Sequence, residues 1–147
     1  MIQKSSKSFS AGAGEHLVLG ELLKRGTEAY LAHGKTQPGW DIAAINIHGK
    51  ILRIQVKAIN WPLDCAVNGK FHAHFDILII VLLNGNDQTR FLVIPQSNLD
   101  QYLSAPNPDK RGLTRTLTIG KNFKNHTSKS LINYENDWSA INNLPSA

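Results

Sequence analysis

The stretch that decides the fold is WDIAAINIHGKILRIQVKA, residues 40–58. Two runs rich in β-branched and small apolar residues, 41–47 and 51–58, flank His48-Gly49-Lys50, and this pattern predicts a β-hairpin. Side chains alternate between the two faces of a strand. The second run therefore predicts a strand with two different faces. The apolar face, which should pack on another element, consists of Leu52, Ile54, Val56 and Ala58. The polar face consists of Arg53, Gln55 and Lys57.

The segments around the hairpin predict a mixed sheet with the hairpin at its centre. A helix is expected over 13–25, because Leu19, Leu22 and Leu23 share one stripe and Gly26 can end it. The remaining pattern predicts strands at 29–32, 75–83, 89–95 and 114–119, an irregular segment at 59–74, and short helices at 97–103, capped by Ser97, and 138–144. The fold class is therefore α/β, in the form of an α+β mixed sheet.

Length and composition fit one domain over residues 1–147, with 1–10 as a flexible basic arm. The net charge of +5 and a pI of about 9.5 favour a polyanionic partner. The lone Cys65 excludes an intrachain disulfide, and Met1–Ser10 has no apolar core, so we expect a cytoplasmic, reducing location. The longest apolar run, 75–83, is too short to cross a bilayer, so no membrane partner is expected.

Four polar residues occur in an order that suggests chemistry. Glu15 lies on the first helix, Asp41 opens the hairpin, and Gln55 and Lys57 leave the same face of its second strand. Oxygen ligands of this kind suit Mg²⁺ or Mn²⁺, and a neighbouring ammonium can stabilise charge on a phosphate. Each residue also has a structural explanation: Asp41 could cap a turn, Gln55 and Lys57 could form a solvated face, and Glu15 could favour the helix dipole.

The length of the hairpin loop tests whether these side chains can meet. If His48-Gly49-Lys50 is a three-residue loop, Ile47 pairs with Ile51 and Asp41 lies opposite Lys57, on the shared polar face. A two-residue loop would place Asp41 opposite Val56, on the wrong face. A metal site therefore requires an odd loop or a bulge in the first strand.

Gly14-Glu15 in a first helix, then Trp40-Asp41, then Ile54-Gln55-Val56-Lys57, resembles the PD-(D/E)XK nuclease superfamily. It is most similar to the small group I intron-encoded homing endonucleases that use Gln-x-Lys. The resemblance implies a restriction-endonuclease-like αβββαβ core, a homo-oligomer (dimer or tetramer), metal ligands Asp41, Gln55 and Glu15, and catalytic residues Glu15, Asp41, Gln55 and Lys57. Two positions depart from the superfamily pattern: Trp40 replaces the proline, and Gln55 replaces an acidic residue and removes one negative charge.

The expected function is a Mg²⁺-dependent endodeoxyribonuclease that hydrolyses phosphodiester bonds in double-stranded DNA, with site-specific homing as the leading subtype. Two alternatives share the fold. One is a structure-specific nuclease such as a Holliday-junction resolvase. The other is a catalytically silent DNA-binding protein, which the neutral Gln55 favours.

Basic residues late in the chain are candidate DNA contacts. Lys121, Lys124 and Lys129 lie in one loop, and Arg111 and Arg115 could extend the same footprint. The alternative is an ordinary solvated loop. A weaker hypothesis is a zinc site at Cys65, His72 and His74. Structural zinc needs four ligands, so His126, far along the chain, would have to supply the fourth.

Overall fold

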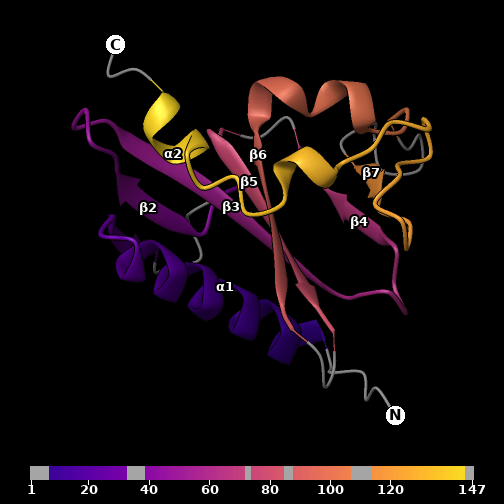
Figure 1. Cartoon of the computed structure of the whole chain (residues 1–147), viewed down its shortest axis with the longest axis horizontal. Helices are drawn as coiled ribbons and strands as arrows, with labels where there is room; N and C mark the ends of the chain where they lie inside the picture. Colours follow the sequence, from indigo (N-terminus) through magenta and orange to yellow (C-terminus); the bar gives the residue numbers. More distant parts are fainter. Residues whose placement is uncertain (1–6, 33–38, 72–73, 85–87, 107–113, 145–147) are drawn as a thin grey trace.

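A computed structural model describes residues 7–32, 39–71, 74–84, 88–106 and 114–144 (Figure 1). Its main sheet has the strand order β1-β2-β3-β5-β6, and β4 and β7 form a separate two-stranded ribbon. The strands are β1 (Glu28–Leu31), β2 (Ile42–Ile45), β3 (Ile51–Asn60), β4 (Ala66–Gly69), β5 (Ile77–Leu83), β6 (Arg90–Pro95) and β7 (Arg115–Thr118). The helices are α1 (Lys7–Lys24), α2 (Ala140–Asn143) and the 3₁₀ turns η1 (Gln96–Asn98), η2 (Asp100–Tyr102) and η4 (Ile132–Tyr134).

The main sheet is mixed, which confirms the predicted fold class. β3 is its central strand: it pairs antiparallel with β2 and parallel with β5. The pairs β1–β2 and β5–β6 are antiparallel. The predicted hairpin is therefore correct, and its second strand connects the two halves of the sheet.

One face of the sheet packs on α1. The apolar side chains of β3 meet Val18 and Leu22 there, together with alternate residues of β5: Ile77, Ile79 and Val81. Burial of this surface at about 25 cal/mol per Å² is the main force that holds the helix in place. The predicted helical stripe was wrong at one position, because Leu23 is 52% exposed and Val18 takes its place in the core.

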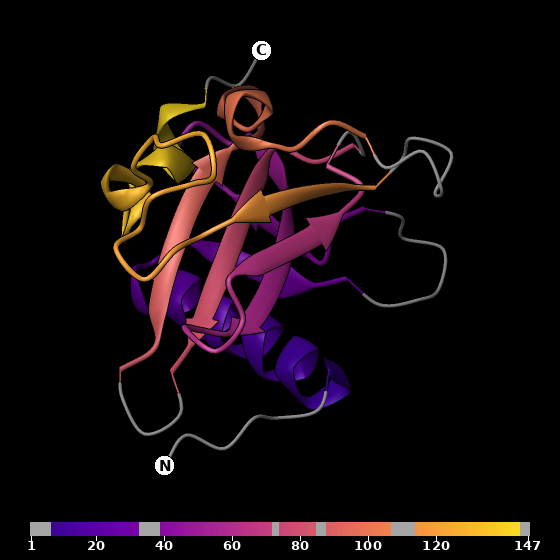
Figure 2. The same cartoon turned by 90° about the vertical axis from the view of Figure 1, so that its right-hand side faces the viewer.

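The opposite face is covered by the β4–β7 ribbon. Figure 2 shows β4 and β7 lying across the face of the main sheet that is turned away from α1. Val67 and Leu117 of the ribbon are buried in a second core with the other alternate residues of β5: Leu78, Ile80 and Leu82. β5 is therefore apolar on both faces, as expected for a strand covered on both sides.

Several boundaries differ from the sequence predictions. The helix begins at Lys7, so residues 7–10 are helical and not a flexible arm, while 1–6 lie outside the described residues. The segment 59–74, expected to be irregular, contains the end of β3 and the whole of β4. In the described part of 61–76, β4 stands where the αβββαβ pattern has its second helix.

The late elements also need correction. The expected strand at 114–119 exists as β7, but it pairs with β4 and does not join the main sheet. The expected helix at 97–103 consists of two 3₁₀ turns, and Ser97 makes no capping bond because η1 has no side-chain cap. No helix in the described part of the chain is long and apolar enough to span a membrane.

Candidate active site

The β2–β3 hairpin sets the position of the first acidic residue. The Asn46 N–H donates to the Lys50 carbonyl at 3.0 Å and closes a three-residue loop, Ile47-His48-Gly49. Gly49 has a φ of 77°, a conformation that glycine adopts without strain. The predicted loop had the right length but began one residue too late, so Asp41 lies level with Gln55 and not with Lys57. The position opposite Asp41 thus moves by two residues along β3, from Lys57 to Gln55. Because two is an even number, Asp41 stays on the polar face.

Asp41 is fixed by the backbone of β3. Its N–H donates to the Ile54 carbonyl at 2.7 Å, and its Oδ2 accepts from the Val56 N–H at 2.7 Å. Burial raises the pKa of the Asp41 carboxyl, although the Val56 N–H and the charge of Lys57 act in the opposite direction. The carboxylate is therefore held rigidly in a position where a nearby cation would stabilise its charge.

Glu15 reaches the same site because α1 lies unusually close to β3. A methyl group at Gly14 would lie 2.8 Å from the Cβ of Ala58, so only glycine permits this approach. Burial raises the pKa of Glu15, the charge of Asp41 raises it further, and His16 lowers it in part. The effect of the Asp41 charge on the pKa of Glu15 indicates that the two carboxylates lie in one electrostatic environment.

Gln55 is the residue with an unexplained side chain. It is 7% exposed, and its Oε1 has no hydrogen-bond partner among the described residues. Only two other buried side-chain polar atoms in the described residues share this property: Thr127 Oγ1 and Trp138 Nε1. An unsatisfied buried acceptor costs about 1–3 kcal/mol, so Gln55 Oε1 has reason to bind a ligand.

Lys57 is confined by the ribbon. A Cβ on Gly69 of β4 would lie 3.1 Å from the Lys57 Cε, so the lysine stem passes directly beside this glycine. The charge of Lys57 acts on the pKa of Asp41. The ammonium is therefore part of the same site as the carboxylates.

All four residues line one cleft with a volume of about 840 Å³. Two carboxylates and the unpartnered amide oxygen form a set of hard oxygen donors, which fits Mg²⁺ or Mn²⁺. Within the described chain, no group of three or more His, Cys, Asp and Glu side chains could hold a metal ion, so the amide would have to serve as the third ligand. Nothing in the described residues supports the predicted zinc site, and His72 lies outside them.

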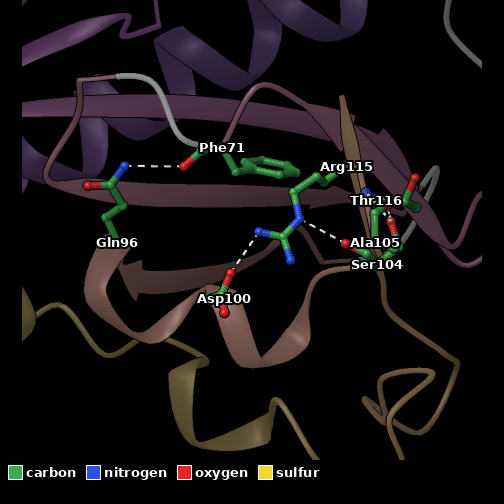
Figure 3. Close-up of polar contacts among 7 residues, drawn as sticks. All are labelled: Phe71, Gln96, Asp100, Ser104, Ala105, Arg115 and Thr116. Atoms are coloured by element: carbon green, nitrogen blue, oxygen red, sulfur yellow. Dashed lines mark hydrogen bonds and ion pairs between the residues drawn. The ribbon is translucent and has the colours of Figure 1, made fainter. Parts of the chain in front are cut away.

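The predicted DNA-contacting residues have different environments. Lys121 and Lys124 are exposed on the loop after β7, whereas Lys129 donates to Gln101 Oε1 at 3.2 Å. Arg115 is engaged within the protein: it pairs with Asp100 at 2.7 Å and donates to the Ser104 carbonyl at 2.8 Å (Figure 3). Arg111 lies outside the described residues.

The sequence reading missed the residues that β4 contributes. Ala66 and Asn68 of β4 line the cleft, as does Asp64, which precedes the strand. The alternation of exposed and buried positions in β4 is a strand signal, but four residues are too few for it to stand out.

No family model and no curated protein matches this sequence. Its fold is similar to a solved structure, the bacterial homing endonuclease I-Ssp6803I, with a TM-score of 0.67 over 93% of this chain and 91% of the other. The chain therefore shares the fold of that homing endonuclease. Sequence identity between the two is 16%, so the likeness is one of architecture.

Proposed function

We propose that this protein is a Mg²⁺-dependent endonuclease that cuts double-stranded DNA. The observation that carries the proposal is the buried Gln55 Oε1, unpartnered among the described residues, in a cleft lined also by Glu15, Asp41 and Lys57. Metal-dependent phosphodiester hydrolysis uses this combination of groups, and the homing-endonuclease fold is consistent with it.

Each residue has a role in the proposal. Asp41, Gln55 and Glu15 would hold the metal ion, which would supply Lewis-acid activation of the scissile phosphate and of a bound water. Asp41 is positioned by the Val56 N–H, so its geometry does not depend on the ion. Lys57 places a positive charge beside the phosphate, where negative charge develops during hydrolysis.

The substrate and assembly belong to the same proposal. The net charge of +5 favours DNA as the partner, and the solved structure with this fold is described as a homing endonuclease. Site-specific cleavage by a homo-oligomer follows by analogy, because one chain of this size covers only a short target. Mn²⁺ should substitute for Mg²⁺, since both take oxygen ligands.

The decisive experiment incubates plasmid DNA, genomic DNA and a four-way junction with the protein in Mg²⁺, in Mn²⁺ and in EDTA. Cleavage is expected with either metal ion and not in EDTA. Lys57→Ala should abolish it, whereas the matched control Lys24→Ala, at the exposed end of α1, should cut like wild type. Equal cleavage by both variants would contradict the proposed site, and cutting of the junction alone would point to a structure-specific nuclease.

One observation favours a second candidate, a DNA-binding protein without nuclease activity. Gln55 is neutral, which leaves the cleft with one carboxylate fewer than a site with an acidic residue at this position. Such a protein would bind DNA in EDTA and fail to cut it in Mg²⁺. Gln55→Glu tests whether weak metal binding is the cause, because a carboxylate at this position should create cleavage if only metal affinity were lacking.

A further inference from the structure

The β4–β7 ribbon has two faces of different character. Its inner face contributes Val67 and Leu117, which are 2% and 0% exposed, to the core beneath it. The outer face consists of two cross-strand pairs, Ala66 with Thr118 and Asn68 with Thr116. Burial of the inner face is the main source of stability for the ribbon. On the outer face, Thr118 has a structural role, because its Oγ1 accepts from the His126 N–H at 2.9 Å.

The outer face is small, polar and free of negative charge. Its four residues are Ala, Asn and two Thr, and neither 65–70 nor 115–126 contains an acidic residue. The Thr116 hydroxyl donates to Asn68 Oδ1 at 2.6 Å, which fixes the amide and leaves its NH₂ group to donate elsewhere. Short side chains let the backbone of the ribbon approach a partner closely, and threonine adds methyl groups for apolar contact.

Exposed lysines flank this face at both ends. Lys70 follows β4 at one end, and Lys121 and Lys124 follow β7 at the other. The loop that carries Lys121 and Lys124 is anchored, because Phe123 is buried and packs on Trp61 with ring centroids 5.2 Å apart. The positive charges therefore border the polar face in fixed positions, which complements the two phosphate backbones that border a groove of DNA.

The ribbon is both anchored and adjacent to the candidate active site. Arg115 ties β7 to Asp100 and Ser104, on the η1–η2 side (Figure 3). On the other side, Ala66 and Asn68 line the cleft that holds Glu15 and Lys57. A partner that lies on the outer face of the ribbon therefore continues directly into the cleft.

We propose that the β4–β7 ribbon reads DNA sequence by entering the major groove beside the cleavage site, with Asn68 and Thr116 as the specificity-determining residues. The major groove is about 12 Å wide and admits a two-stranded β-ribbon. The NH₂ group of Asn68, which has no acceptor among the described residues, donates to an acceptor on a base edge, such as guanine O6 or N7 or thymine O4. This inference rests on the proposed function only in taking duplex DNA as the partner.

The test is selection from a pool of duplexes with a randomised centre, carried out in EDTA so that cleavage plays no part. Wild type should enrich one sequence. Asn68→Ala and Thr116→Val should lose about tenfold discrimination at one or two adjacent base pairs, with the rest of the selected sequence unchanged. Thr116→Val keeps the β-branched shape. Asn143→Ala, the matched change at an exposed position of α2, should select the wild-type sequence.

A second readout separates base contacts from phosphate contacts. The salt slope of binding should be the same for Asn68→Ala and wild type, whereas the double variant Lys121→Ala/Lys124→Ala should keep the sequence preference and lose about 0.9 from the slope per lysine. Undiminished discrimination by the Asn68 and Thr116 variants, or no sequence enriched by wild type, overturns the inference. A wild type that selects a sequence but never cuts it in Mg²⁺ supports this inference and overturns the nuclease proposal instead.

Discussion

β3 and β5 are parallel neighbours in the centre of the sheet, yet they differ on one face. The register pairs Gln55 with Leu78 and Lys57 with Ile80. On the α1 face both strands are apolar and buried. On the opposite face β5 is covered by the ribbon and stays apolar, while β3 opens onto the cleft and is polar.

This difference separates the residues that stabilise the fold from those that we assign to chemistry. A leucine at position 55 would continue the apolar surface of β5 and would leave no amide unsatisfied. The protein instead buries Gln55 Oε1 without a partner, at a cost of about 1–3 kcal/mol. A buried polar group that weakens the fold and lines a cleft is a candidate for function.

The largest effect is expected on the β5 side. Leu78→Ala removes a fully buried side chain and should lower the free energy of unfolding by about 2–5 kcal/mol, because it leaves a cavity. Urea denaturation measures this. Cleavage per folded molecule should stay close to wild type, and a selective loss of cleavage would show that β5 also serves the site.

At Lys57 we expect a loss of cleavage with little change in stability. Lys57→Ala should reduce single-turnover cleavage by about a hundredfold or more, since it removes a positioned charge beside the phosphate. The urea midpoint should change little, because the side chain lines the cleft and is only half-buried. Asp41→Ala and Gln55→Ala should also lose most cleavage. If Gln55→Ala cuts like wild type while Asp41→Ala does not, Gln55 is not a metal ligand.

Gln55→Leu gives β3 the same residue that β5 has at the paired position, Leu78. It should raise the free energy of unfolding in EDTA by about 1–3 kcal/mol, because the unsatisfied acceptor is removed, and it should abolish cleavage. Denaturation with and without Mg²⁺ gives the comparison. Added Mg²⁺ should stabilise wild type and leave this variant unaffected; a variant less stable than wild type in EDTA would contradict the cost assigned to Gln55.

A smaller effect is expected from pH. The pKa of Asp41 is raised above its ordinary value of 3.8, so the folded protein binds this proton more tightly than the unfolded chain. Stability in EDTA should therefore fall as the pH rises from this ordinary value through the raised one, with Glu15 acting in the same direction. Asp41→Asn should flatten the profile of thermal midpoint against pH, and an identical profile would refute the assignment.

Part of this comparison follows from the sequence alone. The hairpin and β5 were predicted because their patterns are strong: alternation in 51–58 and a continuous apolar run in 75–83. The order Glu15, Asp41, Gln55, Lys57 was likewise sufficient to nominate the candidate site, and the structure gathers these residues in one cleft.

The remaining features depend on contacts between distant segments. β4 is a short strand that exists because it pairs with β7, far along the chain. The start of α1 contains Ser and Gly, which are weak helix formers, so its helical state depends on packing and not on propensity. The lack of a partner for Gln55 Oε1 and the contact of Gly14 with β3 are tertiary facts that no local pattern encodes.

The three-residue loop Ile47-His48-Gly49 has a consequence for how the gene can change. Inserting or deleting one codon there would exchange the two faces of β2 relative to β3, turning Asp41 into the core and an apolar residue into the cleft. Two codons would restore the faces and only shift the level at which Asp41 meets β3. Viable length variants of this loop should therefore differ by even numbers of residues, although the loop itself is exposed and does not line the cleft.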